Sequence, residues 1–292
     1  MKAKTRKILK GIGFISPWVV GLLVFQLFPI CASFYYSFCS YDVLNPPVFV
    51  GLDNYVSLAQ DELFWHSLKV TVIYAALALP LSLVVSLFIA ILLNQKIKAR
   101  GLFRTIFYIP SLVPMVALGI LWGWIFRGDQ GILNYLLGLV GIDGPNWLGS
   151  TVWATPSIVI TGLWGVGATV VIYLAALQTV PAELYEAATI DGANTWQKII
   201  HVTIPSISSV IYFNLMLGVI GCLQVFAVPY VMTGGGPERS TYYYTLYLFD
   251  NAFSYLRMGY ASAMAMILTV LILILTWLAH KFSHSKVHYT AE

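Results

Sequence analysis

The sequence predicts an all-α integral membrane protein with six transmembrane helices. Hydrophobic residues make up 59% of its 292 residues and charged residues only 10%, which is far from the composition of a soluble globular domain. The apolar residues fall in long runs, and a transmembrane helix needs about 20 of them. Six runs qualify and form a single transmembrane domain over residues 1–292: about 14–38, 66–93, 104–126, 152–177, 206–228 and 259–280.

The first apolar run, 14–38, follows a basic stretch, which is also how a secretory signal begins. Its apolar part is about 25 residues long, which exceeds the roughly 7–15 apolar residues of a signal core. We therefore expect an uncleaved first transmembrane helix.

Prolines lie within or beside the first four runs and predict kinked helices that pack against one another. They are Pro17, Pro29, Pro80, Pro110, Pro114 and Pro156. In the fourth run, the segment GLWGVG at 162–167 has the composition of a nucleotide-binding loop, but no strand precedes it, and no GxxxxGK[ST] motif occurs in the chain. Close helix packing is the better interpretation of these glycines.

Lysine and arginine are unevenly distributed over the loops between the runs. Twelve fall on the side of the two termini and only four on the other side, so the positive-inside rule places both termini in the cytoplasm. The twelve are Lys2, Lys4, Arg6, Lys7, Lys10, Lys96, Lys98, Arg100, Arg104, Lys198, Lys281 and Lys286, and the four are Lys69, Arg127, Arg239 and Arg257. The net charge of +4 does not indicate a nucleic-acid partner.

His280, His284 and His288 have a spacing that could place them on one helical face, but a polar tail leaving the membrane is a better interpretation than a metal site. The rest of the sequence shows no pattern of a catalytic or metal site. Cys31, Cys39 and Cys222 lack the spacing of metal ligands, and no catalytic constellation falls inside an apolar run, so we expect neither an enzyme nor a metal centre. All twelve carboxylates lie in loops, at the ends of runs or in the C-terminal tail. Proton relays require ionisable groups inside the bilayer, which disfavours a proton-driven carrier. A secondary carrier with a sodium site made of carbonyl groups remains the alternative; otherwise transport is powered from outside the chain.

The segment PAELYEAATIDGANTWQKIIHVTIP, at 181–205, is polar and helix-forming although it lies between two apolar runs. Pro181 suits a first helical position, and Gly192 is expected to end that helix. Asn194 can then cap a second helix, with Gln197 at the capping-box distance. The sequence thus predicts a helix, a tight turn and a second helix, which is also compatible with an amphipathic loop at the membrane surface.

Within this segment, EAATIDGA followed by VTIP resembles the EAA signature of binding-protein-dependent ABC importer permeases. Val202 and Ile204 stand where the family usually has Ile and Leu, while Pro205 is in register. The resemblance implies a coupling segment that sits in a cleft of a cytoplasmic ATP-binding subunit. The residues that it assigns to this contact are Glu186, Ala187, Ala188, Asp191 and Gly192.

Three further stretches are similar to permeases for carbohydrate uptake, of the maltose and glycerol-3-phosphate type. They are VGLDNY at 50–55, VMTGGGPERSTYYYTLYLFDNAF at 231–253 and MGYASAMAM at 258–266. This family implies a subunit of a bacterial or archaeal cell membrane whose partners are a second homologous permease, two cytoplasmic ATP-binding subunits and an extracytoplasmic solute-binding protein. ATP would bind to the partner subunits, so no cofactor is expected on this chain.

The same resemblance implies a solute that is a sugar, a related polyol or a glycerol phosphate. Alignment with the maltose permease places six residues near the solute pathway: Trp164, Gly165, Gly218, Cys222, Gln224 and Val225. Among them only Gln224 offers hydrogen bonds to a sugar, and Trp164 offers a stacking face. The resemblance leaves open whether this subunit or its partner permease contacts the solute.

Overall fold

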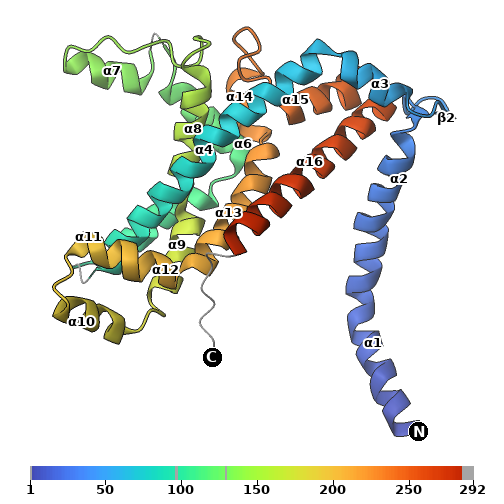
Figure 1. Cartoon of the computed structure of the whole chain (residues 1–292). Helices are drawn as coiled ribbons and strands as arrows, with labels where there is room; N and C mark the ends of the chain where they lie inside the picture. The colour runs from blue at the N-terminus through green and yellow to red at the C-terminus, as the bar shows by residue number, and fades with distance from the viewer. Residues whose placement is uncertain (1, 96–97, 129, 285–292) are drawn as a thin grey trace. The chain divides into compact units, whose positions relative to one another are not determined.

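The computed structural model describes residues 2–95, 98–128 and 130–284 and is helical almost throughout (Figure 1). The expected all-α architecture is therefore confirmed. The elements are, in chain order, α1 (Lys2–Leu22), η1 (Leu23–Leu27), α2 (Phe28–Tyr36), β1 (Cys39–Ser40), β2 (Val48–Phe49), α3 (Asp53–Gln60), α4 (Glu62–Asn94), α5 (Arg100–Tyr108), η2 (Ile109–Leu112), α6 (Met115–Ile125), α7 (Ile132–Leu139), α8 (Ala154–Trp164), α9 (Gly167–Leu177), α10 (Ala182–Ile190), α11 (Thr195–Lys198), η3 (Ile199–Thr203), α12 (Ile204–Ser206), α13 (Ser208–Leu223), α14 (Ala227–Thr233), α15 (Tyr244–Phe249), η4 (Asp250–Ser254) and α16 (Met258–His284). Lys96 and Lys286, two of the basic residues that bear on orientation, lie outside the described residues.

Several helical stretches of the described chain are long and apolar enough to cross a membrane. Three do so singly: Gly11–Tyr36, Glu62–Asn94 and Met258–Lys281. Three bent pairs raise the number to six if each pair is one span: Arg100–Leu112 with Met115–Ile125, Ala154–Trp164 with Gly167–Leu177, and Thr195–Ser206 with Ser208–Leu223. Each predicted run overlaps one of these six regions. Helices able to span a membrane are thus present, and the six-span layout stays a prediction.

The sharpest bend, 101°, lies inside the predicted span 104–126. Val113 has extended backbone angles, φ −71° and ψ 127°, as expected for a residue that precedes a proline, and Pro114 is the N-cap of α6. This run is therefore two helices that meet at an angle. The kink expected from its prolines is confirmed, whereas Pro80 lies inside the unbroken α4.

A π-helical turn precedes two other prolines. η1 ends shortly before Pro29, and η3 ends shortly before Pro205. In a regular α-helix a proline ring clashes with the carbonyl four residues earlier, and a wider turn relieves this clash. After both turns, the next N–H bonds to the carbonyl five residues before it. The helical path therefore continues through both prolines.

The predicted fifth span, 206–228, is not one continuous helix. Residues 224–226 separate α13 from α14. Pro229 has no N–H with which to bond the carbonyl of Val225, and the hydroxyl of Thr245 donates to that carbonyl instead. The helix can therefore end here without leaving this carbonyl unpaired. The sequence does not reveal the break, because apart from Gln224 the apolar side chains continue on both sides of it.

The chain divides into two compact units. The first comprises the residues up to Phe64 together with Leu248–Val270, and the second comprises Trp65–Tyr247 and the residues from Leu271 on. In the first unit, α1, η1 and α2 follow one another as a single rod (Figure 1), whose membrane-span window has no residue buried within the chain. β1 and β2 pair there as a short antiparallel hairpin.

The first unit joins two of the stretches that resemble sugar permeases. Asn54 of VGLDNY donates to the carbonyls of Ser37 and Cys39, at 2.9 Å each. Gly259 of MGYASAMAM lies against the same turn, and its N–H donates to the Tyr41 carbonyl at 3.0 Å. A Cβ at position 259 would lie 2.0 Å from the Cys39 carbonyl oxygen. Only glycine fits this close approach.

In the second unit, α9 packs on α5 and α13. A Cβ on Gly167 would lie 2.2 Å from the Phe107 carbonyl oxygen and 2.9 Å from the Tyr108 Cα. The close packing expected of the glycines at 162–167 is therefore confirmed at this residue. Beside it, buried side chains of α4 and α9 form an apolar cluster around Tyr173, together with Ile207 just before α13.

Candidate functional site

The segment 181–205 forms a helix, a turn and a second helix, as the sequence predicts. α10 begins after its N-cap Pro181, and Gly192 in the turn has a φ of +78°, a region that favours glycine. Asn194 Oδ1 accepts a bond from the Gln197 N–H at 2.9 Å, and Gln197 Oε1 accepts one from the Asn194 N–H at 2.8 Å. The capping box at the start of α11 is therefore complete.

Two side-chain hydrogen bonds, here called the clamp, tie α10 to the chain beyond the turn. Lys198 Nζ donates to Thr189 Oγ1 at 2.8 Å, and the hydroxyls of Tyr185 and Thr203 bond at 3.0 Å. Thr203 is only 5% exposed, so its bond anchors α10 at a buried point. The clamp holds α10 in its folded-back position along α11 (Figure 1). Sequence reasoning missed the clamp because no local pattern marks partners this far apart.

The five residues assigned to coupling lie together on α10 and the turn. Four of them are exposed and Ala188 is half-buried. Close by, Ile190 and Trp196 are 87% and 70% exposed, although both are large and apolar. Exposed apolar side chains gathered beside carboxylates, such as Glu186 and Asp191, are typical of a protein interaction surface. We call residues 186–196 the docking surface.

Within the second unit, a helical path leads from the docking surface to α13. α11, η3 and α12 follow one another and meet α13 at a bend of 72°. Ile207, at this bend, is 1% exposed and packs in the cluster around Tyr173. α13 then runs to the break at 224–226. One stretch of helical chain therefore joins the docking surface to that break.

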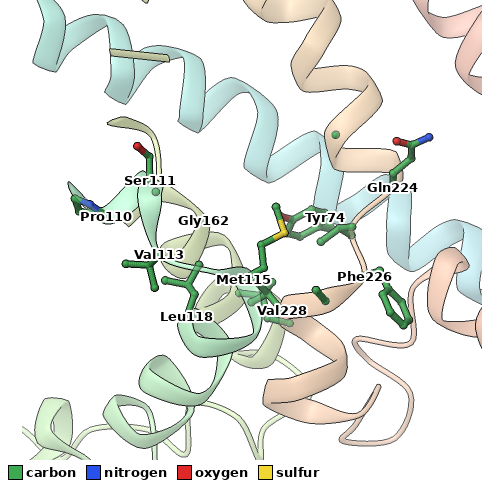
Figure 2. Close-up of a pocket in the computed structure, with 15 residues that line it drawn as sticks. Tyr74, Pro110, Ser111, Val113, Met115, Leu118, Gly162, Gln224, Phe226 and Val228 are labelled. Atoms are coloured by element: carbon green, nitrogen blue, oxygen red, sulfur yellow. The ribbon is translucent and has the colours of Figure 1, made fainter. Parts of the chain in front are cut away.

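A cavity of about 430 Å³ lies where the 224–226 break meets α4, η2, α6, α8 and α14. Figure 2 shows Tyr74, Met115 and Val228 near its centre, and Ser111 and Gln224 on opposite sides. The side chains of Tyr74, Ser111 and Gln224 supply its polar groups, and none of its 15 lining residues is charged. A mostly apolar wall with a few polar groups suits a small, uncharged polar solute.

Three of the six predicted pathway residues line this cavity: Gly165, Gln224 and Val225. The other three lie outside its lining. A Cβ on Gly218 would meet the side chain of Leu79 at 2.4 Å, which indicates close helix packing. The Trp164 ring lies against that of Trp122, with centroids 6.1 Å apart, and Cys222 packs on the cluster around Tyr74. Their role in the pathway stays a prediction.

Sequence reasoning missed the cavity residues Tyr74, Ser111 and Phe226, because they come from distant segments that only the fold brings together. Tyr74 is held in place by the ring of Tyr243, at 5.1 Å between centroids. Tyr243 belongs to the stretch after TGGGP, is fully buried, and donates its hydroxyl to Thr155 at 3.4 Å. Burial raises the pKa of the Tyr243 phenol above its usual range, so the group stays a protonated donor.

Comparisons with known proteins agree with this arrangement. The sequence profile of the family described as "Binding-protein-dependent transport system inner membrane component" matches residues 56–286. The Bacillus subtilis protein described as "Probable ABC transporter permease protein YesP" is 40% identical over 99% of this chain and 96% of its own. The "Trehalose/maltose transport system permease protein MalF" of Thermococcus litoralis is 34% identical over 94% of each chain.

A solved structure shares the fold over its whole length. The crystal structure of a bacterial alginate ABC transporter, in complex with an alginate pentasaccharide-bound periplasmic protein, contains a chain that matches with a TM-score of 0.85. The match covers 99% of both chains at 24% identity. The helical arrangement described above is therefore that of an ABC transporter chain.

Proposed function

Since the chain belongs to the family of binding-protein-dependent transport system inner membrane components, we propose that it is the permease subunit of an ATP-binding-cassette importer for a sugar. The observation that carries the proposal is the full-length similarity to permeases, one of which is described as a trehalose/maltose permease. The chain would form half of the translocation pathway, and a second homologous permease would form the other half. Co-purification of an ATP-binding subunit with the tagged chain tests the proposal.

The partners of such a subunit follow from the family. Two cytoplasmic ATP-binding subunits bind and hydrolyse ATP, so this chain itself needs no cofactor and catalyses no reaction. A solute-binding protein delivers the sugar on the other side of the membrane. The alginate transporter that shares the fold was solved with a periplasmic protein carrying its oligosaccharide, which supports a partner of this kind.

The docking surface is the proposed contact with the ATP-binding subunit. Glu186 offers an exposed carboxylate that can pair with a cation of the partner. Ala187 and Gly192 are small, so the backbone of the ATP-binding subunit can approach them closely. The clamp then makes α10 and the start of α11 move as one body. Movement of this body is passed on through α13 to the cavity, so that the cavity opens alternately to the two sides by rigid-body motion.

The cavity is the proposed solute site, and its chemistry narrows the solute. A glycerol phosphate would bring a negative charge, which needs a cationic or strongly hydrogen-bonding partner when it leaves water. No such cation is among the residues that line the cavity. An uncharged sugar or polyol needs only hydrogen bonds and an apolar or aromatic face, which Gln224, Ser111 and Tyr74 supply. We therefore propose an uncharged sugar as the solute.

Gln224→Leu is expected to impair uptake of the sugar and to leave assembly intact. The exposed carboxamide lies at the edge of the cavity (Figure 2), and loss of its hydrogen bonds should raise the half-saturating sugar concentration about tenfold. Gln60→Leu, on the exposed surface of α3, is the matched control. Unchanged transport affinity in Gln224→Leu removes this residue from the site, and loss of the assembled complex assigns it to packing instead.

The chain is proposed to lie in a bacterial or archaeal cell membrane with both termini in the cytoplasm, because its basic residues gather on that side. On a thiol-free background, cysteine at the exposed Glu238 is expected to react with an impermeant maleimide in intact cells. Cysteine at the exposed Glu183 of α10 is expected to react only after lysis. The reverse pattern overturns the orientation.

A further inference from the structure

The helix α7 (Ile132–Leu139), in the connection between α6 and α8, turns its apolar face away from the protein. Ile132, Tyr135, Leu136 and Leu139 recur at the spacing of one helical face, and they are 61%, 68%, 52% and 66% exposed. The polar side chain of Asn134 instead points inward, toward the chain segments before and after α7. A soluble surface helix has the opposite arrangement, with its apolar stripe against the core.

This orientation is fixed by a hydrogen-bonded centre. Asn134 Nδ2 donates to the carbonyls of Gly128 and Pro145, at 2.9 and 3.1 Å, and its Oδ1 accepts from the indole N–H of Trp147 at 2.6 Å. A Cβ on Gly144 would lie 2.0 Å from Asn134 Oδ1, so the connection closes tightly around this side chain. α7 cannot rotate its stripe inward without breaking all three bonds.

α7 is also too short to cross a membrane by itself. α7 has eight residues, about 12 Å of helix, whereas the hydrocarbon core is about 30 Å thick. On one side it follows α6, and on the other it leads into α8, both of which belong to bent pairs that can span a membrane. Trp124 and Trp153, near these two helix ends, are 73% and 41% exposed. Exposed tryptophans at the ends of spans are typical of the membrane–water boundary.

We propose that α7 lies in the headgroup region of the bilayer, with the stripe 132, 135, 136 and 139 inserted among the lipid chains. The lipid is the occupant that the surroundings favour, because the stripe carries no charge and the preceding helix α6 also exposes large apolar side chains, Ile120 and Trp124. Among the described residues of this connection, the charged ones are the exposed Arg127 and Asp143, and both lie beyond the helix. A short helix of this kind anchors the loop at the interface and thereby holds the ends of α6 and α8 at a set depth.

Electron paramagnetic resonance of spin labels in lipid nanodiscs tests the placement, with the chain in its assembled complex. A single cysteine replaces Leu139 on the stripe. In two reference variants, a cysteine replaces Gln130, on the exposed chain before α7, to report water, or Leu273 in α16, to report lipid. Leu273 is 62% exposed. The background has Cys31, Cys39 and Cys222 replaced by alanine. Molecular oxygen reports lipid exposure, and nickel ethylenediaminediacetate reports water exposure.

At position 139 the ratio of oxygen to nickel accessibility is expected to be several-fold higher than at 130 and to approach that at 273. A ratio equal to that at 130, or protection from both reagents, overturns the proposal, since the stripe then faces water or a protein partner. If the thiol-free background does not assemble, benzoylphenylalanine at position 139 of the native chain replaces the labels. Lipid adducts support the placement, and a crosslinked protein band contradicts it.

Discussion

Charge reversal at Glu186 is expected to leave the chain in the membrane but to remove most of its bound ATP-binding subunit. Glu186 is exposed on α10, so the change is expected to leave the packing of the described residues intact. At the proposed contact, however, a lysine would face the cation that the carboxylate is meant to pair with. Leaving a buried interfacial charge unpaired costs about 2–5 kcal/mol, which corresponds to roughly 30-fold or more in association. Pull-down of the ATP-binding subunit from solubilised membranes measures this loss.

The control for this variant is Glu238→Lys, which makes the same change of net charge at an exposed residue of the loop after TGGGP. It should retain the ATP-binding subunit as the unchanged chain does. Solute-stimulated ATP hydrolysis, measured on the same preparations, should fall only in Glu186→Lys. If Glu186→Lys keeps both the subunit and the stimulated hydrolysis at the level of the unchanged chain, then α10 does not dock as proposed.

Gly192→Val is expected to weaken the same association by roughly tenfold or more, through the backbone alone. Gly192 has a φ of +78°, and nothing lies within 4 Å of where its Cβ would be. A β-branched residue in this region stores about 1–3 kcal/mol of strain. The turn can relieve the strain only by changing the angle between α10 and α11, which alters the docking surface. The expected result is a complex that assembles poorly or hydrolyses ATP without uptake.

Gly141 provides a matched control for this backbone effect. It has a φ of +77° with nothing within 4 Å of its Cβ position, and it lies in the connection after α7, away from the docking surface. Gly141→Val therefore carries the same strain and should retain the ATP-binding subunit fully. Equal loss in both variants would mean that strain destabilises the chain in general, which contradicts a specific role for the turn at Gly192.

The sequence predicts the parts of this fold whose signals are local. Long apolar runs give the helices, and Pro114 gives the bend that follows Val113. The turn between α10 and α11 is predicted from Gly192, Asn194 and Gln197, because a positive φ and a capping box both depend on residues within one turn. The motif resemblance then supplies the proposed role of the segment, which no periodicity could indicate.

The parts that escape the sequence depend on contacts between distant residues. At the break 224–226, the Thr245 hydroxyl donates a hydrogen bond to the Val225 carbonyl. Pro229 has no N–H to make this bond. The cavity likewise needs Tyr74 from α4 and Ser111 from η2, far from the Gln224 that the sequence singles out. The reversed orientation of α7 depends on the bonds of Asn134, and its composition alone does not reveal them.

Sugar uptake by purified components shows directly whether the chain is a subunit of an ATP-driven importer. The chain is purified with the subunits that accompany it, reconstituted into proteoliposomes, and supplied with the cognate solute-binding protein loaded with labelled sugar. We expect an ATP-binding subunit and a second permease to co-purify. Uptake should require ATP and the solute-binding protein, and it should persist when proton and sodium gradients are collapsed. Uptake by the chain without an ATP-binding subunit, driven by an ion gradient, would contradict this expectation and identify a secondary carrier.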